Sequence, residues 1–89
     1  MLISIVLPTF NRSHVLGRAI DSVLAQTYSE WELIIIDNYS SDQTDNLVRS
    51  YHSSKIFLFK IHNNGIIAKS RNFGINQAQG KLIAFLDSD

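Results

Sequence analysis

The sequence predicts an α/β fold in which helices cover both faces of one mostly parallel, four-stranded sheet. Four short runs have the length and the β-branched or aromatic content of strands, and segments with helical patterns separate them. Three of the four runs are continuously apolar, as the buried strands of parallel sheets are. Strands and helices that alternate in this way pair in parallel through right-handed crossovers. This order is typical of Rossmann-like, three-layer α/β/α architectures.

The predicted strands suit one small sheet. They cover residues 2–7 (LISIVL), 32–36 (ELIII), 56–61 (IFLFKI) and 82–86 (LIAFL). The third strand is the one that carries positive charge, with Lys55 just before it and Lys60 near its end. Because lysine side chains protect exposed sheet edges, we expect the third strand to lie at an edge.

The first predicted helix has the clearest pattern. From residue 15 to residue 24 the apolar side chains recur in pairs every four positions, which places them on one helical face. Asn11 and Ser13 are both available to cap its start, because their side chains accept hydrogen bonds from free backbone N–H groups. The second helix is predicted to be short, within residues 42–52, and Ser40 is placed to begin a capping box.

The third predicted helix covers residues 66–79 and ends before Gly80. Glycine commonly follows the last turn of a helix, where a left-handed backbone ends it. Gly74 lies inside this helix, where it costs about 1 kcal/mol relative to alanine unless a neighbour packs closely against it.

The composition indicates one small domain without a strong electrostatic field. The chain has 89 residues, of which 45% are hydrophobic, and this suits a single core. Its eight basic and eight acidic residues cancel, so the net charge favours neither nucleic acid nor an anionic membrane surface. The absence of cysteine excludes disulfides and thiolate sites and fits a cytoplasmic location. No apolar run approaches the ~20 residues that span a membrane.

Polar and acidic residues follow the predicted strands at their carboxyl ends. Residues 8–11 (PTFN) follow the first strand, residues 37–42 (DNYSSD) follow the second, and Asp87-Ser88-Asp89 follows the fourth. Ligands of open parallel sheets bind at this edge. The glycine-rich loop of dinucleotide-binding proteins and the lysine loop of P-loop NTPases are both absent.

The two aspartates at residues 87 and 89 have a possible chemical use. Carboxylates are the ligands that Mg²⁺ or Mn²⁺ prefers, and such a cation can hold a diphosphate. Two aspartates after an apolar strand are also typical of a solvated chain end, so this motif by itself leaves both interpretations open.

Three segments carry a resemblance to a known family: "SIVLPTFNR", "SVLAQTYSEWELIIIDNYSSDQT" and "NNGIIAKSRNFGINQAQGKLIAFLDSD". In this order and at these spacings they resemble the nucleotide-sugar-binding half of the family 2 glycosyltransferases, which have the GT-A fold. The resemblance spans essentially the whole chain. It implies that residues 1–89 form the donor-binding half, and that the acceptor-binding half and the catalytic base are absent from this chain. We therefore expect the chain alone to be inactive.

The resemblance also implies roles for individual residues. Phe10 stands where the family has an aromatic residue near the nucleobase, and Arg71 where an arginine faces the nucleotide. Asp87 matches the acid beside the ribose, and Asp89 matches the acid that coordinates Mg²⁺ or Mn²⁺. This cation stabilises the charge on the departing nucleoside diphosphate. The full set of implied nucleotide-binding residues is Pro8, Thr9, Phe10, Asn11, Asp37, Asn38, Arg71 and Asp87.

Two positions depart from the family pattern. Asn38 replaces an acid that recognises the imide of the base, and an amide donates as well as accepts, which weakens the implied preference for uracil or thymine. Tyr39 replaces a glycine, so a left-handed backbone would be costlier there. The three histidines show no metal-ligand spacing and are interpreted as ordinary polar residues.

The function implied by the resemblance is transfer of a glycosyl group from a nucleoside-diphosphate sugar, of the UDP or dTDP type, to an acceptor hydroxyl. The family further implies a glycan or lipid-linked acceptor, a role in polysaccharide or cell-envelope glycan synthesis, and a peripheral place at the inner face of the membrane for the full-length protein. We expect no nucleic acid partner.

Two alternatives stay open on the sequence. The first is a non-catalytic module that associates with other chains, or with copies of itself as a homo-oligomer, through exposed sheet or helix surface. The second is a phosphatase of the haloacid dehalogenase type, in which D-x-D also follows an apolar strand and its first aspartate is the nucleophile. In those phosphatases the motif opens the fold, whereas here it follows three strand-and-helix units, so this alternative has less support.

Overall fold

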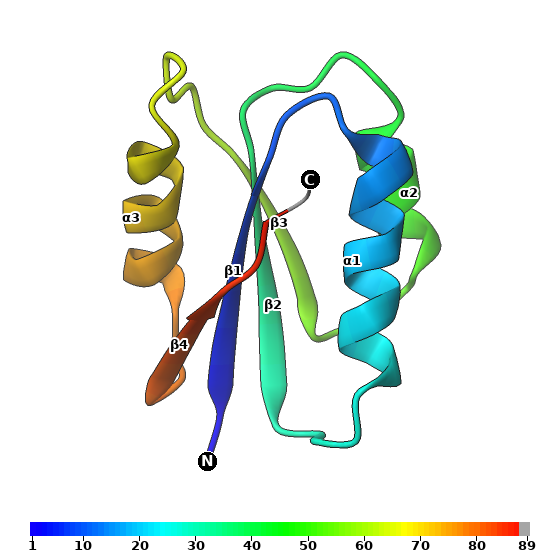
Figure 1. Cartoon of the computed structure of the whole chain (residues 1–89), viewed down its shortest axis with the longest axis vertical. Coiled ribbons are helices and arrows are strands. Elements are labelled where there is room, and N and C mark those ends of the chain that lie inside the picture. Colours follow the sequence, from blue (N-terminus) through cyan, green and yellow to red (C-terminus); the bar gives the residue numbers. More distant parts are fainter. Residues whose placement is uncertain (88–89) are drawn as a thin grey trace.

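The computed structural model describes residues 1–87 of the chain, and these residues alternate between strands and helices as predicted. Its sheet has four strands, all parallel, in the order β3-β2-β1-β4. Figure 1 shows α1 and α2 on one face of this sheet and α3 on the other, which confirms the three-layer α/β/α fold. The elements are β1 (Ile3–Thr9), α1 (Ser13–Ala25), β2 (Trp31–Asp37), α2 (Thr44–Ser50), β3 (Ile56–Lys60), α3 (Ile67–Gln77) and β4 (Leu82–Phe85).

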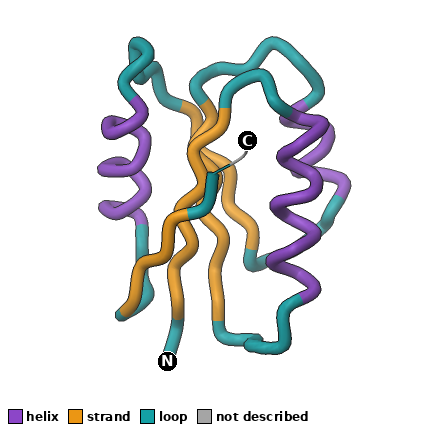
Figure 2. The backbone as a smooth tube through the Cα atoms, viewed as in Figure 1, coloured by secondary structure: helices purple, strands orange, loops and turns teal. Residues whose placement is uncertain are grey.

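The strand order reverses at β1. From β1 the chain adds β2 and then β3 on one side, and it returns through α3 to place β4 on the other side. The tube in Figure 2 shows this return, with the segment after α3 running back to the strand beside β1. The prediction that the third strand lies at an edge is confirmed, because β3 pairs only with β2 among the described strands. A crevice for ligands is expected where the strand order reverses, between β1 and β4.

The core has one part on each face of the sheet, because successive residues of a strand point to opposite faces. The larger part joins the sheet to α1 and α2, and the smaller part lies under α3, where Phe59 and Phe73 meet edge to face with their ring centroids 5.6 Å apart. Both faces of β1 and β2 are therefore covered, which explains their continuous apolar sequence. The sheet residues buried toward α1 and α2 are Ile5, Leu7, Trp31, Leu33 and Ile35, and those buried toward α3 are Val6, Ile34 and Ile36.

The prediction that apolar strands are covered on both faces is wrong for β4. Its four residues are all exposed, and Leu82 and Phe85 keep about half of their surface, 53% and 51%. β4 is an edge strand, and the helix that precedes it packs on β1 and β2. Apolar sequence therefore predicted a strand correctly but not its burial.

The predicted side-chain caps of the first two helices are wrong. Neither α1 nor α2 has a side-chain cap from its own N-cap residue. Asp42 instead accepts hydrogen bonds from the backbone N–H of Ser13, at 3.0 Å, and of Thr44, at 3.1 Å. Asn11 and Ser40, the predicted caps, form other hydrogen bonds within the two loops. One carboxylate thus serves the starts of both helices.

The role predicted for Gly80 is also wrong. Its backbone is not left-handed, and it lies beyond the end of α3. A Cβ atom there would lie 2.7 Å from both the Leu2 carbonyl oxygen and the Ser4 hydroxyl oxygen. Glu32, a buried carboxylate, accepts hydrogen bonds from that hydroxyl at 2.6 Å and from the Gln79 N–H at 2.7 Å. Gly80 is needed because the connection to β4 passes directly over the start of β1.

The helices are short. The longest in the described part of the chain is α1, with 13 residues. No helix among residues 1–87 combines the length and apolar character that crossing a lipid bilayer requires.

Candidate functional site

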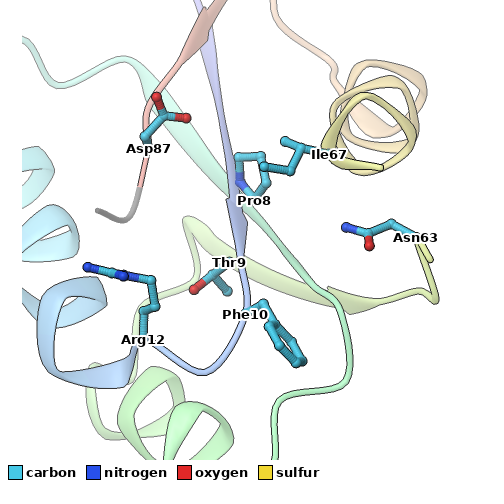
Figure 3. Close-up of a pocket in the computed structure, with 7 residues that line it drawn as sticks. All are labelled: Pro8, Thr9, Phe10, Arg12, Asn63, Ile67 and Asp87. Carbon is cyan, nitrogen blue, oxygen red and sulfur yellow. The ribbon is translucent and has the colours of Figure 1, made fainter. Parts of the chain in front are cut away.

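A cavity of about 150 Å³ lies at the carboxyl ends of the strands, beside the point where the strand order reverses. Its walls come from the end of β1 and the loop after it, from the chain after β4, and from the β3–α3 connection with the first residue of α3 (Figure 3). The lining residues are Pro8, Thr9, Phe10, Arg12, Asn63, Ile67 and Asp87. Four of the predicted nucleotide-binding residues are among them: Pro8, Thr9, Phe10 and Asp87.

The end of β1 gives the cavity an apolar and a polar surface. Phe10 lies just beyond the strand and keeps 51% of its surface exposed, so its ring is available for stacking. Thr9 is 5% exposed, and its hydroxyl Oγ1 has no hydrogen-bond partner among the described residues. A buried hydroxyl without a partner is uncommon in folded proteins and indicates a place where a bound group can supply the missing hydrogen bond.

Arg71 and Asp87 form an ion pair at the rim of the cavity. The Arg71 Nη2 donates to the Asp87 Oδ1 at 3.2 Å, and the two side chains are 41% and 62% exposed. An exposed pair of this kind contributes little to stability, so a ligand can replace it at low cost. The Arg71 Nε is buried and has no hydrogen-bond partner in the described part of the chain. The guanidinium therefore keeps donor capacity for a bound group.

Asn38 connects three loops at the carboxyl edge of the sheet. Its backbone N–H donates to the Thr9 carbonyl oxygen at 3.1 Å, and its side-chain Oδ1 accepts from the Asn63 N–H at 2.9 Å. Asn63 in turn lines the cavity. The amide oxygen that could accept from a base is thus already engaged, and the Asn38 amide nitrogen is left as the freer group.

Asp37 and Asn11 lie outside the cavity lining and join the two loops beside it. Asp37 is fully buried and accepts hydrogen bonds from the backbone N–H and the hydroxyl of Ser40. The same Ser40 hydroxyl oxygen accepts from the Asn11 N–H at 2.8 Å, while the Asn11 side chain accepts from the Ser41 N–H at 2.7 Å. Asn11 has a left-handed backbone, with φ of 49°. These contacts hold the turn from which Phe10 projects.

Tyr39 has the left-handed backbone that is costly for a residue with a side chain, with φ of 49°. Its ring stacks on His62, with ring centroids 4.1 Å apart and planes 16° from parallel. Such a stack contributes about 0.5–1.5 kcal/mol, which offsets much of the backbone cost. His62 therefore supports a strained turn and is more than an ordinary polar residue.

Lys60, the last residue of β3, lies beside the loop that follows β2 and contacts two carboxylates. Its Nζ pairs with the Asp45 carboxylate at 2.7 Å, a hydrogen bond that raises the pKa of Lys60. The same Nζ lies 3.9 Å from the buried Asp37 carboxylate, so it balances a charge that would otherwise be costly to bury.

Asp89, the predicted metal ligand, lies outside the described residues. Among residues 1–87, no three histidine, aspartate or glutamate side chains come close enough to hold a metal ion. Protein sites for Mg²⁺ usually combine one or two carboxylates with substrate phosphates and water. Asp87 supplies one exposed carboxylate of this kind at the cavity, because only its Oδ1 is engaged by Arg71.

Three lining residues were not predicted: Arg12, Asn63 and Ile67. Asn63 lies three residues after the end of β3, so the rule that directed attention to the other strand ends applied to it as well. Arg12 comes directly after residues 8–11, the segment predicted to follow the first strand. Ile67 carried no chemical signal, because an isoleucine at the start of a helix is usually a packing residue.

The chain is similar to known glycosyltransferases. It is 42% identical over 88 residues to UDP-Glc:alpha-D-GlcNAc-diphosphoundecaprenol beta-1,3-glucosyltransferase WfgD of Escherichia coli. That match covers 99% of this chain and 35% of the relative, so the chain spans about a third of the relative's length.

Solved structures share the fold. S. aureus TarS (residues 1–349), in complex with UDP, matches with a TM-score of 0.92 and 30% identity, over 100% of this chain and 28% of that one. The mannosyltransferase PcManGT of Pyrobaculum calidifontis, in complex with GDP-Man and Mn²⁺, matches with a TM-score of 0.88 over 98% of this chain and 27% of that one. At 22% identity the second likeness concerns the fold alone.

The family model confirms the resemblance found in the sequence. The model described as glycosyl transferase family 2 matches residues 4–89, which is nearly the whole chain. The structural matches confirm the GT-A fold, and the phosphatase alternative is left without support. This chain therefore belongs to glycosyl transferase family 2.

Proposed function

We propose that this chain is the nucleotide-sugar-binding part of a glycosyltransferase that moves a glycosyl group from a nucleoside-diphosphate sugar to an acceptor hydroxyl. The observation that carries this proposal is the cavity at the strand-order reversal, where Thr9, Phe10 and Asp87 converge from opposite ends of the chain. The likeness to UDP-bound TarS and the UDP-Glc donor named for the E. coli relative support it.

The residues at the cavity suit the parts of such a donor. The exposed ring of Phe10 can stack on a base by its face, and the donors of Arg71 can meet carbonyl or phosphate oxygens. Asp87 can accept hydrogen bonds from ribose hydroxyls through its free oxygen. We assign Asp89, two residues after Asp87 in the sequence, to Mg²⁺ or Mn²⁺, which when bound neutralises charge on the departing diphosphate.

The donor is proposed to be of the UDP or dTDP type. Calorimetric titration of the chain with UDP, dTDP and GDP, each with and without Mn²⁺, tests this assignment. We expect UDP and dTDP to bind more tightly than GDP, and Mn²⁺ to strengthen binding of both, because the cation bridges carboxylate and diphosphate. Equal binding of all three nucleotides, or binding that is insensitive to Mn²⁺, would contradict the site assignment.

The acceptor is proposed to be a glycan or a lipid-linked glycan, in the synthesis of a polysaccharide or cell-envelope glycan. The diphosphoundecaprenol-linked acceptor named for the E. coli relative supports this. We propose that residues 1–89 alone do not catalyse glycosyl transfer. The chain spans only 35% of that relative, and Asp87 is the only described carboxylate that lines the cavity. Metal-dependent sugar transfer by the purified chain would contradict this proposal.

Association with another chain is a second candidate role, favoured by the exposure of the whole of β4. Light scattering over a concentration series, with and without UDP and Mn²⁺, separates the two roles. Donor binding predicts a nucleotide effect at every concentration, whereas an association module predicts concentration-dependent scattering that the nucleotide does not change.

A further inference from the structure

Two hydrogen-bond donors on the cavity wall, the Thr9 hydroxyl and the Arg12 guanidinium, have no partner among residues 1–87. The Thr9 hydroxyl is buried and unpartnered, as described above. Arg12, three residues further along the chain, is exposed and forms neither an ion pair nor a side-chain hydrogen bond within residues 1–87. Figure 3 draws the Thr9 oxygen on the side of the residue that faces Arg12. Leaving a buried hydroxyl unpaired costs about 1–3 kcal/mol, which a bound acceptor would recover.

The neighbouring carboxylates are engaged elsewhere. Asp87 shares the cavity with Arg12, but its Oδ1 is held by Arg71 at 3.2 Å. Asp42 lies at the start of α1, next to Arg12 in the fold, but its oxygens accept from the N–H groups of Ser13 and Thr44. The guanidinium of Arg12 therefore brings to the cavity a positive charge that has no direct ion pair among residues 1–87.

A guanidinium and a hydroxyl together form a set of donors without a strong acceptor. A guanidinium matches the oxygens of carboxylates and phosphates through two parallel hydrogen bonds. The group that fits these donors is an anion with several oxygens. The α1 N-terminus cannot replace them as an anion site, because the Ser13 N–H is already given to Asp42.

We propose that Arg12 binds the phosphate oxygens of the nucleoside diphosphate and that the Thr9 hydroxyl donates to the same anionic group. This inference rests on the proposed nucleotide function. It gives the phosphates two protein donors, Arg12 and the Thr9 hydroxyl, that can bind them without a metal ion. Arg12 is thus proposed as a binding residue of this chain, and Phe10, which Figure 3 shows on the other side of Thr9, supplies an apolar surface in the same cavity.

The test compares UDP with uridine, which has the same base and ribose but no phosphate. Binding of each to the full chain is measured by titration for the wild type, Arg12→Gln and a control, Arg18→Gln. Arg18 is an exposed arginine on α1 that does not line the cavity. We expect Arg12→Gln to weaken UDP binding about tenfold and to leave uridine binding unchanged, since only a charge-assisted hydrogen bond to phosphate is lost. Arg18→Gln should change neither by more than about twofold.

The variant Thr9→Val distinguishes a binding role of the Thr9 hydroxyl from a purely structural role. Valine has nearly the same shape as threonine but lacks the hydroxyl, so we expect weaker UDP binding together with an unchanged or higher melting temperature, because an unpaired buried group is removed.

The outcomes separate this inference from the proposed function. Equal UDP affinity of Arg12→Gln and the wild type, or an equal loss of uridine binding, would overturn the assignment of Arg12 while the nucleotide function stands. If the wild type binds neither UDP nor uridine, with or without Mn²⁺, the nucleotide function itself fails and this inference fails with it.

Discussion

Gly17 and Gly74 both lie inside helices, but the space around them differs. A Cβ atom on Gly17 would meet the Leu47 side chain at 3.8 Å, which is ordinary van der Waals contact. A Cβ atom on Gly74 would lie 2.4 Å from the Val6 Cγ1, well inside contact distance. Val6 is fully buried on β1, so it cannot move aside easily. Gly74 is thus the point of closest approach between α3 and the sheet.

Alanine at these two positions should have opposite effects on stability. We expect Gly17→Ala to raise the free energy of unfolding by about 0.5–1 kcal/mol, because alanine favours the helix. We expect Gly74→Ala to lower it by about 1–3 kcal/mol, because overpacking against Val6 outweighs the same helix preference. Thermal and urea unfolding of both variants measure this. Stabilisation by Gly74→Ala would mean that α3 does not pack on β1 as closely as described.

The sequence predicted which residues lie at the cavity better than it predicted which hydrogen bonds these residues form. Phe10 and Asp87 line the cavity as their places after β1 and β4 indicated. The engagement of the Asn38 oxygen could not be foreseen, because its donor is the Asn63 N–H, 25 residues away. The partner of Tyr39 likewise lies on another loop. Contacts between loops depend on the three-dimensional arrangement, which local sequence patterns do not contain.

At the scale of elements, Asp42 links the starts of α1 and α2. Partial burial by itself would raise the pKa of Asp42, but hydrogen bonds from Thr44 and Ser13 outweigh this and lower the pKa. A carboxylate whose pKa is lower in the folded state stabilises that state above its unfolded pKa of about 3.9. This stability is lost as the pH falls through the lower, folded pKa.

Asp42→Ala should therefore destabilise the fold by about 1 kcal/mol at pH 7, which is the usual loss for a removed helix cap. We expect the difference from the wild type to shrink below about pH 4, as the Asp42 carboxylate becomes protonated. Asp42→Asn is the matched control, because it keeps one acceptor oxygen but carries no charge that titrates. Urea unfolding at pH values from 3 to 7 measures this, and a difference independent of pH would refute the charged role.

The elements themselves were predictable, since their apolar periodicity reflects the core that they build. The predicted strand over residues 32–36 corresponds to β2 (Trp31–Asp37), and the short second helix to α2 (Thr44–Ser50). The helix starts were predicted with wrong caps because the capping carboxylate of α1 comes from another loop, 29 residues away. The exposure of β4 was missed because apolar composition is the same for a covered strand and for an uncovered edge.

At the scale of the whole molecule, the two edges of the sheet differ in protection. β3 carries Lys60 and follows Lys55, and lysines at an edge discourage pairing with other chains. β4 consists of four uncharged, exposed residues whose outer backbone groups have no partner strand in the described part of the chain. We therefore propose the β4 edge as the side for association with another chain.

Leu82→Lys should reduce self-association while hardly changing stability. Leu82 is 53% exposed, so we expect the free energy of unfolding to change by no more than about 0.5 kcal/mol. Light scattering over a concentration series should show fewer associated species, because a charge now blocks the edge. Phe57→Lys, at a 40% exposed position on the lysine-flanked β3, is the control and should leave the scattering unchanged. Equal effects of the two variants would contradict a special role for β4.

The pairing of β1 with β4 also determines when the cavity can exist. The register joins Ile3 to Leu82, so Thr9 and Asp87 reach the cavity from segments separated by almost the whole sequence. Closing so long a loop costs chain entropy, and contacts of high sequence separation form slowly in folding. β1, β2 and β3 can assemble beforehand, while the cavity is still incomplete. We therefore expect β4 to pair last in folding, so that the proposed nucleotide site is complete only after this step. We also expect a nucleotide bound at that site to oppose detachment of β4.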